Sequence, residues 1–282
     1  METWKIGRVR VSRVVEMLMD VSPTILLPDA VPENLVPMHA WLKPHFLHDD
    51  NQIPLSFHSF LIESDGARII VDTCVGNDKP RDVPEWNKRQ SDFLAQLAAR
   101  GARTDAVDFV MCTHLHVDHV GWNTILKDGE WVPTFPKARY LFGRKEWEFW
   151  QHEVDPFGKE ARGDSIEPIL HAGLADLVES DHRLTSEVSL VPTPGHTPGH
   201  VSVLIESAGE RAIITGDLFH HPVQFARPRW PDVADVDTVR AAETRQTFMQ
   251  RFCDGTLVLG THFASPTGGR IVRDGEHFRF DV

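Results

Sequence analysis

The sequence His114-Leu-His116-Val-Asp118-His119 constrains this chain more than any other feature. Imidazole nitrogens and carboxylate oxygens are the ligands that zinc and similar first-row ions accept. The preceding residues 107–112 are nearly all apolar, which predicts a short strand buried on both faces in a layered α/β core. The cluster then follows the strand as a loop, a rigid place to hold a metal. An extended loop lets the first two imidazoles chelate one ion, while the next two side chains point towards a second. A solvated His-rich loop is the alternative.

Three later segments each place one further ligand on a tight loop after an apolar strand. His196 lies between prolines and glycines that fix the backbone and allow close approach. Asp217 ends the apolar run 211–215 after a glycine, and His262 follows residues 256–259 in the same way. Each residue alone is compatible with a purely structural role. Together with the first cluster, they indicate a metal centre assembled from distant parts of the chain.

The order His-x-His-x-Asp-His, Gly-His, Gly-Asp and a late His is similar to that of the metallo-β-lactamase superfamily of dinuclear hydrolases, over roughly residues 55–282. The resemblance implies an α/β fold, the αββα sandwich of two packed mixed sheets flanked by helices, with the metal site at one edge. It implies one ion held by His114, His116 and His196, and a second held by Asp118, His119 and His262. It implies that Asp217 bridges both ions, that Asp72 braces the ligand loop and that His200 is structural rather than a ligand.

Departures from the family pattern narrow the branch. The commonest β-lactamases use Cys where Asp217 stands and have no ligand at the position of His119, so β-lactam hydrolysis is not our first choice. Quorum-type lactonases carry Tyr three residues beyond the bridging Asp, whereas this chain has His220 there. His220 is a candidate to assist the leaving group, or else a surface or supporting histidine.

The C-terminal half resembles the methyl parathion hydrolase-like branch, and residues 146–150 resemble the segment that carries its pocket tryptophan. Residues 146–151 are expected to form a helix with Trp147 and Trp150 on one face. These two side chains and Phe219 are the predicted substrate contacts, with core packing as the alternative for the tryptophans.

The remaining sequence predicts one domain over residues 1–282, without repeats or a linker. The Pro-rich segment 21–56 lacks a clear period and is expected to be an irregular substrate lip, plain surface packing or a dimer contact. Segment 143–185 is a second expected lip, with a helix near 166–178. We expect a hairpin of 57–63 and 68–72 around Asp65-Gly66, and helices over 86–100 and 237–252. Strands are expected in residues 1–20, 138–142, 188–191, 200–205, 211–215, 256–259 and 270–273.

Composition excludes some classes of partner. A net charge of −12 argues against nucleic acid, and no apolar run is long enough for a membrane span. Three widely spaced cysteines and the lack of a visible signal peptide favour the cytoplasm. A homodimer is compatible with these observations.

These observations predict a hydrolase in which two divalent ions about 3.5–4 Å apart share a hydroxide. Zinc is the first choice of metal, with manganese, iron or cobalt as alternatives. The hydroxide attacks a neutral, apolar ester, lactone or phosphotriester, Asp217 holds both ions, and Asp118 takes or relays a proton. Hydrolytic dehalogenation or aryl-ether cleavage on the same site is the alternative. A diiron redox protein is disfavoured because such members usually add a flavin domain, for which this chain has no room.

Overall fold

The computed structural model describes residues 2–153 and 161–282. Its first sheet is mixed and has the strand order β1-β2-β3-β4-β5-β8-β9 in the described part of the chain. The strands are β1 (Thr3–Ile6), β2 (Val9–Val21), β3 (Ile53–Ser64), β4 (Ala67–Val71), β5 (Phe109–Met111), β8 (Arg139–Gly143) and β9 (Ala175–Val178). The predicted hairpin is confirmed: β3 and β4 pair antiparallel, and Asp65 and Gly66 form the turn with φ of 51° and 79°. Strands β4, β5, β8 and β9 are parallel, so their carboxyl ends meet at one edge.

The second sheet has the order β10-β11-β12-β13-β14-β15 among the described residues. Its strands are β10 (Val188–Pro192), β11 (Val201–Ser207), β12 (Glu210–Ile214), β13 (Leu257–Leu259), β14 (Gly268–Asp274) and β15 (His277–Asp281). A separate hairpin joins β6 (Thr124–Lys127) to β7 (Glu130–Pro133). Strand β12 is parallel to β13 and runs in the same direction as β10, because each is antiparallel to β11.

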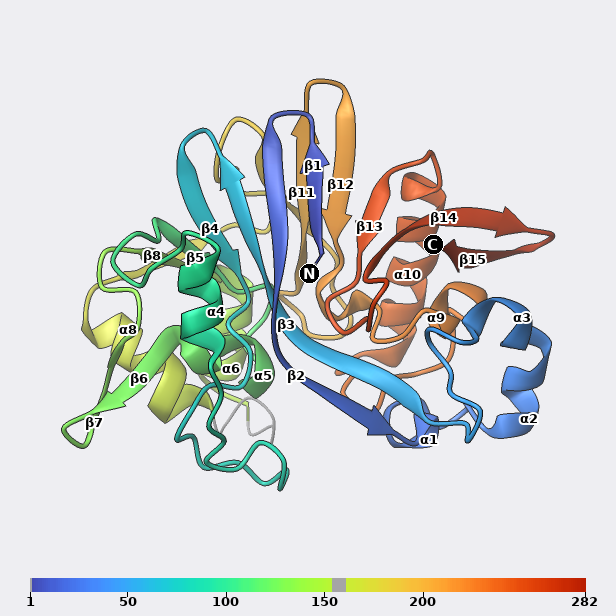
Figure 1. Ribbon diagram of the computed structural model, residues 1–282, viewed down its shortest axis with the longest axis horizontal. Helices are drawn as coiled ribbons and strands as arrows, with labels where there is room; N and C mark the ends of the chain where they lie inside the picture. The colour runs from blue at the N-terminus through green and yellow to red at the C-terminus, as the bar shows by residue number, and fades with distance from the viewer. Residues whose placement is uncertain (1, 154–160) are drawn as a thin grey trace.

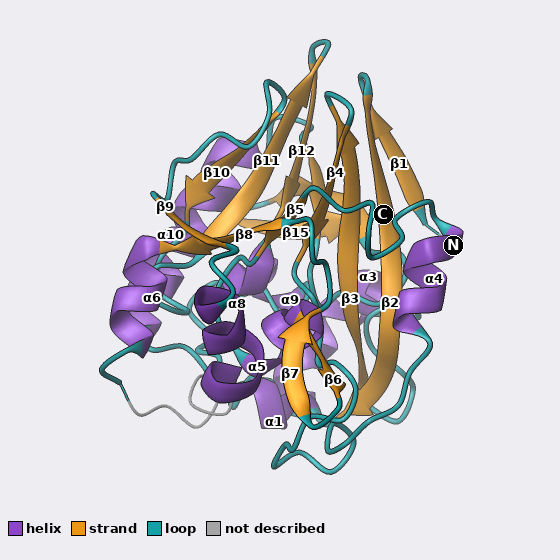
Figure 2. Cartoon of the chain, turned by 90° about the vertical axis from the view of Figure 1, so that its left-hand side faces the viewer, coloured by secondary structure: helices purple, strands orange, loops and turns teal. Residues whose placement is uncertain are grey.

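The two sheets pack face to face, and helices cover their outer faces (Figure 1; Figure 2). Side chains alternate along a strand, so an unbroken apolar strand serves two cores at once. On β3, Phe60 and Ile62 lie in the core between the sheets, while Leu61 packs under the helices of the first sheet. On β12, Ile214 lies between the sheets and Ile213 packs towards the second helical layer. The predicted sandwich is confirmed.

The helices and helical turns fall into two groups. Those next to the first sheet are α4 (Phe93–Ala99), α5 (Val117–Val120), η2 (Gly121–Asn123), α6 (Arg144–Trp150), η3 (Arg162–Ile166) and α8 (Glu167–His171). Those next to the second sheet are α1 (Pro23–Leu26), α2 (Pro32–Leu35), η1 (Val36–Met38), α3 (His39–Leu42), η4 (Gly216–Leu218), α9 (Val223–Ala226) and α10 (Thr238–Phe252). The expected helix at 237–252 is confirmed as α10, whose first turn is capped by the Asp237 carboxylate accepting from the Arg240 amide at 2.9 Å. None of the described helices combines the length and apolar content that a membrane span needs.

Three expectations about secondary structure are corrected. The segment 21–56 is not wholly irregular: it holds four short helical turns, three of which begin at or next to a proline, a residue preorganised for the first turn of a helix. The helix expected over 86–100 begins only at Phe93. The helix expected near 166–178 is present only over Glu167–His171 as α8; its C-terminal part is wrong, because Ala175–Val178 form β9, paired parallel with β8. Sheet pairing there overrides the helical pattern.

The strand directions determine where loops gather. The loops after β4 and β5 lie at the carboxyl edge of the first sheet, and those after β10, β12 and β13 lie at the corresponding edge of the second. These loops carry Asp72, the cluster at 114–119, and residues 193–200, 216–220 and 260–263. The predicted ligands therefore converge on one end of the sandwich.

Candidate metal centre

The loop after β5 presents its ligands in two directions because its backbone changes conformation within the cluster. His116 is extended, with φ −69° and ψ 157°, and α5 begins immediately after it. The extended part places His114 Nε2 3.0 Å from His116 Nδ1. The helical turn α5 then carries Asp118 and His119, and the His119 ring centroid lies 4.0 Å from that of His114. The backbone therefore changes conformation between the first two residues of the cluster and the last two.

The first group of donors combines the loop that carries His114 and His116 with the loop that carries His196, and it includes Asp217. His196 Nε2 lies 3.0 Å from His116 Nδ1 and 3.3 Å from His114 Nε2. Asp217 Oδ2 lies 3.7 Å from His114 Nε2 and 3.6 Å from His196 Nε2. The four donor atoms lie within 4.8 Å of one another, and all four residues are buried.

The second group lies beside the first and shares Asp217 with it. Nε2 of His119 and Nε2 of His262 each lie 3.5 Å from Asp118 Oδ2. Asp217 Oδ2 is 3.1 Å from His119 Nε2, and its Oδ1 is 3.2 Å from His262 Nε2. The structure thus brings together all seven predicted ligands, with Asp217 between two groups of three.

The donor set fits divalent cations. Among the described residues, His119 Nε2 and Asp217 Oδ1 are buried without a hydrogen bond of acceptable geometry. Buried polar atoms in proteins are normally hydrogen-bonded, so two such atoms on neighbouring donor residues are consistent with a shared partner such as a metal ion. Nitrogen and oxygen donors at this spacing suit zinc, and equally manganese, iron or cobalt.

The electrostatics of the centre favour ionised carboxylates. Burial would raise the pKa of Asp217, but the surrounding imidazoles, His119 first, bring it well below its ordinary value. Burial lowers the pKa values of His114 and His196 well below the ordinary value, so both imidazoles are neutral. Burial would lower the pKa of His119, but the charges of Asp217, Asp118 and Asp72 raise it well above its ordinary value, so this imidazole has to lose a proton before it can coordinate a metal.

Asp72 and His200 occupy supporting positions. Asp72 accepts hydrogen bonds from the Thr113 amide at 2.7 Å and the Thr113 hydroxyl at 2.9 Å, and its Oδ2 lies 3.0 Å from His119 Nδ1. His200 Nε2 accepts from the Asp217 amide at 2.8 Å, and burial lowers the pKa of His200 to about 3. Both residues therefore contact the ligand loops from outside the group of donors, as such partners do in other metal sites.

Two carboxylates in the loop before α10 were missed by the sequence reasoning. Asp235 Oδ1 lies 3.3 Å from His196 Nδ1, and its two oxygens accept from the fully buried Arg245. Asp232 Oδ2 lies 3.2 Å from Nδ1 of His220, whose Nε2 is 3.0 Å from Asp217 Oδ2. Burial would lower the pKa of His220, but Asp232 and Asp217 raise it to about 9.

A cavity of about 290 Å³ opens onto the donors. Its polar lining, among the described residues, consists of Asp118, Asp217, Asp232, His116, His196, His220 and His262. The apolar lining comes from Met19, Val21, Ile25, Leu26, Leu55, Phe57, Val83, Trp86, Val233 and Ala234. Neither Lys nor Arg belongs to this described lining. The segment 21–56 therefore contributes to the cavity wall. The Val233 amide donates a hydrogen bond to the Leu26 carbonyl of this segment at 3.0 Å.

The predicted aromatic contacts lie elsewhere. Phe219 is fully buried, and its ring stacks on that of Phe225 with 4.2 Å between the ring centroids. The Phe219 ring therefore lies in the core and does not line this cavity. Trp150 is buried, with its ring 5.5 Å from that of His116, and Trp147 packs against the helices of the first sheet. No described residue of 143–185 lines the cavity, and residues 154–160 of that expected lip lie outside the described residues.

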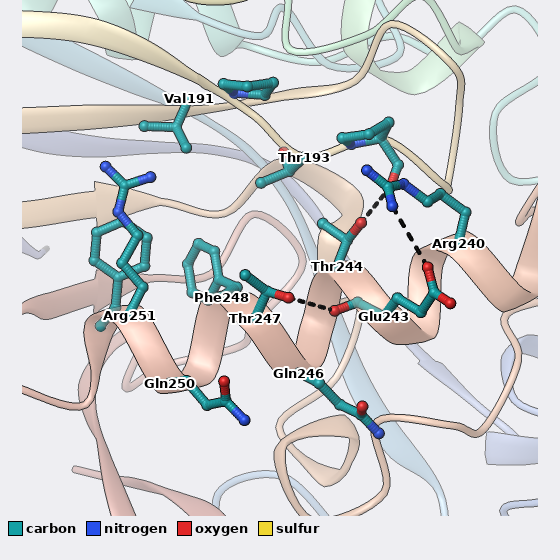
Figure 3. Close-up of a pocket in the computed structure, with 13 residues that line it drawn as sticks. Val191, Thr193, Arg240, Glu243, Thr244, Gln246, Thr247, Phe248, Gln250 and Arg251 are labelled. Atoms are coloured by element: carbon teal, nitrogen blue, oxygen red, sulfur yellow. Dashed lines mark hydrogen bonds and ion pairs between the residues drawn. The ribbon is translucent and has the colours of Figure 1, made fainter.

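A larger hollow of about 490 Å³ lies between α10 and the end of β10 (Figure 3). Its polar groups bond to one another: Arg240 Nη1 lies 3.4 Å from Glu243 Oε2, and the Thr247 hydroxyl donates to the Glu243 carbonyl at 3.0 Å. Thr244 donates to the Pro194 carbonyl at 2.7 Å. This hollow is lined by none of the predicted metal ligands, so the smaller cavity beside the donors is the candidate active site.

A sandwich of two mixed sheets with a His/Asp centre at one edge defines a class of metal-site α/β proteins. The chain belongs to the metallo-β-lactamase superfamily, because the model of that family matches residues 54–275. N-acyl homoserine lactonase AttM of Rhizobium radiobacter is 27% identical over 237 residues, which cover 75% of this chain and 82% of that protein. Probable metallo-hydrolase Rv2300c of Mycobacterium tuberculosis is 28% identical over 193 residues, 60% of this chain and 58% of that protein.

Solved structures show the same fold. A hydrolase of the β-lactamase superfamily, AbOPH, has a TM-score of 0.78 at 26% identity, over 99% of this chain and 96% of that one. AidC, a dizinc quorum-quenching lactonase, has a TM-score of 0.80 at 20% identity, with the same coverage. The similarity to AidC concerns the fold alone.

Proposed function

We propose that this protein is a hydrolase with two divalent metal ions, zinc by preference, that opens a neutral, apolar lactone or ester. The observation that carries the proposal is the pair of donor groups sharing Asp217 at the end of an apolar cavity. His114, His116 and His196 would hold one ion, Asp118, His119 and His262 the other, and Asp217 both. Lactones come first among the substrates because lactonases are among the relatives, and phosphotriesters belong to the same chemical range.

The ions, when bound, supply a hydroxide at neutral pH and polarise the oxygen of the electrophile. Two side chains beside the donors are placed to move or hold protons during the reaction. The Asp118 side chain is 12% exposed and faces the cavity, so its carboxylate can accept a proton and pass it to the leaving oxygen. His220 Nε2 is directed at Asp217 and is in place to hydrogen-bond the leaving group, while Asp232 holds its Nδ1.

The cavity wall determines which substrates fit. Trp86 and Phe57 pack edge to face at 5.3 Å and line the cavity beside His262. Because the described wall offers apolar side chains and carboxylates but no Lys or Arg, an anionic substituent there would lose its hydration without gaining a partner. We therefore expect neutral substrates with an acyl chain or an aryl group. The assignment to the methyl parathion hydrolase-like branch remains a prediction.

Metal analysis combined with a substrate panel tests the function. Protein stripped with a chelator should lose turnover of lactones and aryl esters and regain it with two equivalents of zinc or manganese. Asp217→Ala should abolish turnover, whereas Asp254→Asn, a surface carboxylate paired with Arg211, should leave it unchanged. Retained turnover in the stripped protein or in Asp217→Ala would contradict the proposal. Phosphotriesters and haloaromatics in the panel, with phenol and halide release measured, separate the remaining substrate classes.

A further inference from the structure

Glu146 is a buried carboxylate that touches two of the ligand loops without being a ligand. Its side chain belongs to the first turn of α6 and the residue is only 1% exposed. Oε1 accepts from the Leu115 amide at 3.2 Å and from the Trp150 indole at 2.7 Å. Oε2 accepts from the Gly199 amide at 3.0 Å.

The two amides belong to the loops that supply the first donor group. Leu115 stands between His114 and His116, and Gly199 follows His196 by three residues. One carboxylate thus joins loops that are some eighty residues apart, since His196 and His114 are separated by 82 positions. In the described part of the chain, the hydrogen bonds of Glu146 reach these two loops and Trp150, and not the loops that carry Asp217 and His262.

A glycine in the loop of His196 allows α6 to approach this loop closely. A Cβ on Gly199 would lie 2.3 Å from the Glu146 amide nitrogen, so only glycine lets the first turn of α6 come this close. At the other end of α6, the Trp150 ring lies 5.5 Å from the ring of His116. The short helix α6 therefore contacts the first donor group through both a carboxylate and an aromatic ring.

We propose that Glu146 is a positioning residue that holds the loops of His114–His116 and His196 in register and so sets the affinity of the first metal ion separately from the second. The proposal rests on the proposed function, because it concerns the same metal centre. The Leu115 amide, the Gly199 amide and the Trp150 indole are all N–H donors, and satisfying them takes an acceptor on both oxygens. Gln at this position keeps the size but turns an NH₂ group towards a donor.

The test is zinc titration of metal-free Glu146→Gln against a chromophoric chelator, with cobalt absorption as a second readout of ligand geometry. We expect one of the two zinc equivalents to bind about 10–100-fold more weakly than in the wild type, the loss typical when a residue that supports a metal ligand is replaced. The affinity for the other equivalent should stay within about threefold of the wild-type value. In a His262→Ala background, which weakens the second group, the remaining equivalent should show the same loss. Should Glu146→Gln fail to fold, Glu146→Asp keeps the charge but is too short to reach both loops, and should lose affinity for the same ion.

Glu16→Gln is the matched control. Glu16 is also buried and accepts from a backbone amide, that of Val75 at 2.8 Å, and from an indole, that of Trp122 at 2.7 Å. We expect it to lower the unfolding temperature of the metal-free protein without changing either zinc affinity. Equal loss of both equivalents in the two variants, or wild-type affinity in Glu146→Gln, would overturn this inference alone. Wild-type protein that takes up fewer than two ions would contradict the proposed function and this inference with it.

Discussion

Asp235 and Arg245 form an ion pair behind His196, and replacing Asp235 with Asn tests whether the pair holds that imidazole in place. Both side chains are fully buried, and the two carboxylate oxygens lie 2.8 and 3.1 Å from Arg245 Nη2. Burial would raise the pKa of Asp235, but the hydrogen bond with His196 and the charge of Arg245 bring it well below its ordinary value. Asp235 is therefore ionised, and its loss leaves the guanidinium without a counter-charge.

The size of the effect follows from this burial. Breaking a buried ion pair by removing one partner typically costs about 3–5 kcal/mol, because the remaining charge stays uncompensated. An unfolding entropy of about 2.1 cal/mol/K per residue amounts to about 0.6 kcal/mol/K for a chain of 282 residues. The unfolding temperature of the metal-free protein should then fall by about 5–8 °C. Since Asn has one acceptor oxygen for His196 and Arg245, zinc affinity should also fall by about 10–100-fold.

Calorimetry of the metal-free protein and zinc competition titration measure the two effects separately. Glu179→Gln is the control, since Glu179 pairs with Arg144 at 2.8 Å but both side chains are exposed. A surface pair of this kind contributes about 0–1 kcal/mol, so the control should change neither stability nor zinc affinity appreciably. An Asp235→Asn protein that unfolds within about 1 °C of wild type and binds zinc equally well would refute the role given to this pair.

Three further perturbations have expected outcomes. Trp86→Ala should raise KM for apolar esters about tenfold with little change in kcat, measured by steady-state kinetics, because it removes cavity wall without touching the donors. Burial lowers the pKa of Lys79 from 10.5 to about 7, so the unfolded chain binds more protons between these values and the unfolding free energy should rise with pH across that window. Lys79→Met should lose this rise, of at most about 1.4 kcal/mol per pH unit, in denaturant unfolding of the metal-loaded protein from pH 7 to 9. Gly121→Ala should cost at least about 3 kcal/mol in the same assay, because its Cβ would lie 1.8 Å from the Val75 carbonyl oxygen.

The sequence predicted the centre better than its surroundings for a chemical reason. A metal ion accepts few residue types, so His114, His196 and His262 could be recognised although they lie far apart in the chain. The strands that carry them are mostly apolar, and this pattern indicated a layered α/β core, while the sandwich itself was implied by the family resemblance. At 166–178 the pattern did not separate the short helix α8 from the strand that follows it and pairs with β8.

Asp72 was expected beside the ligand loop from the family resemblance, but Asp235 and Glu146, which also contact ligand loops, have no comparable signature. An imidazole Nδ1 can be held by a carboxylate, a backbone carbonyl or a hydroxyl, so Asp235 could have been replaced by several other groups at other positions. Glu146 resembles an ordinary acidic residue in the first turn of a helix, where the helix dipole alone would account for it. Its position between Leu115 and Gly199 depends on how α6 packs across two loops, which is a property of the folded chain. For this reason the types of residue at the proposed metal centre follow from chemistry, whereas its geometry depends on tertiary contacts, and at these contacts two proposed ions could be given different affinities.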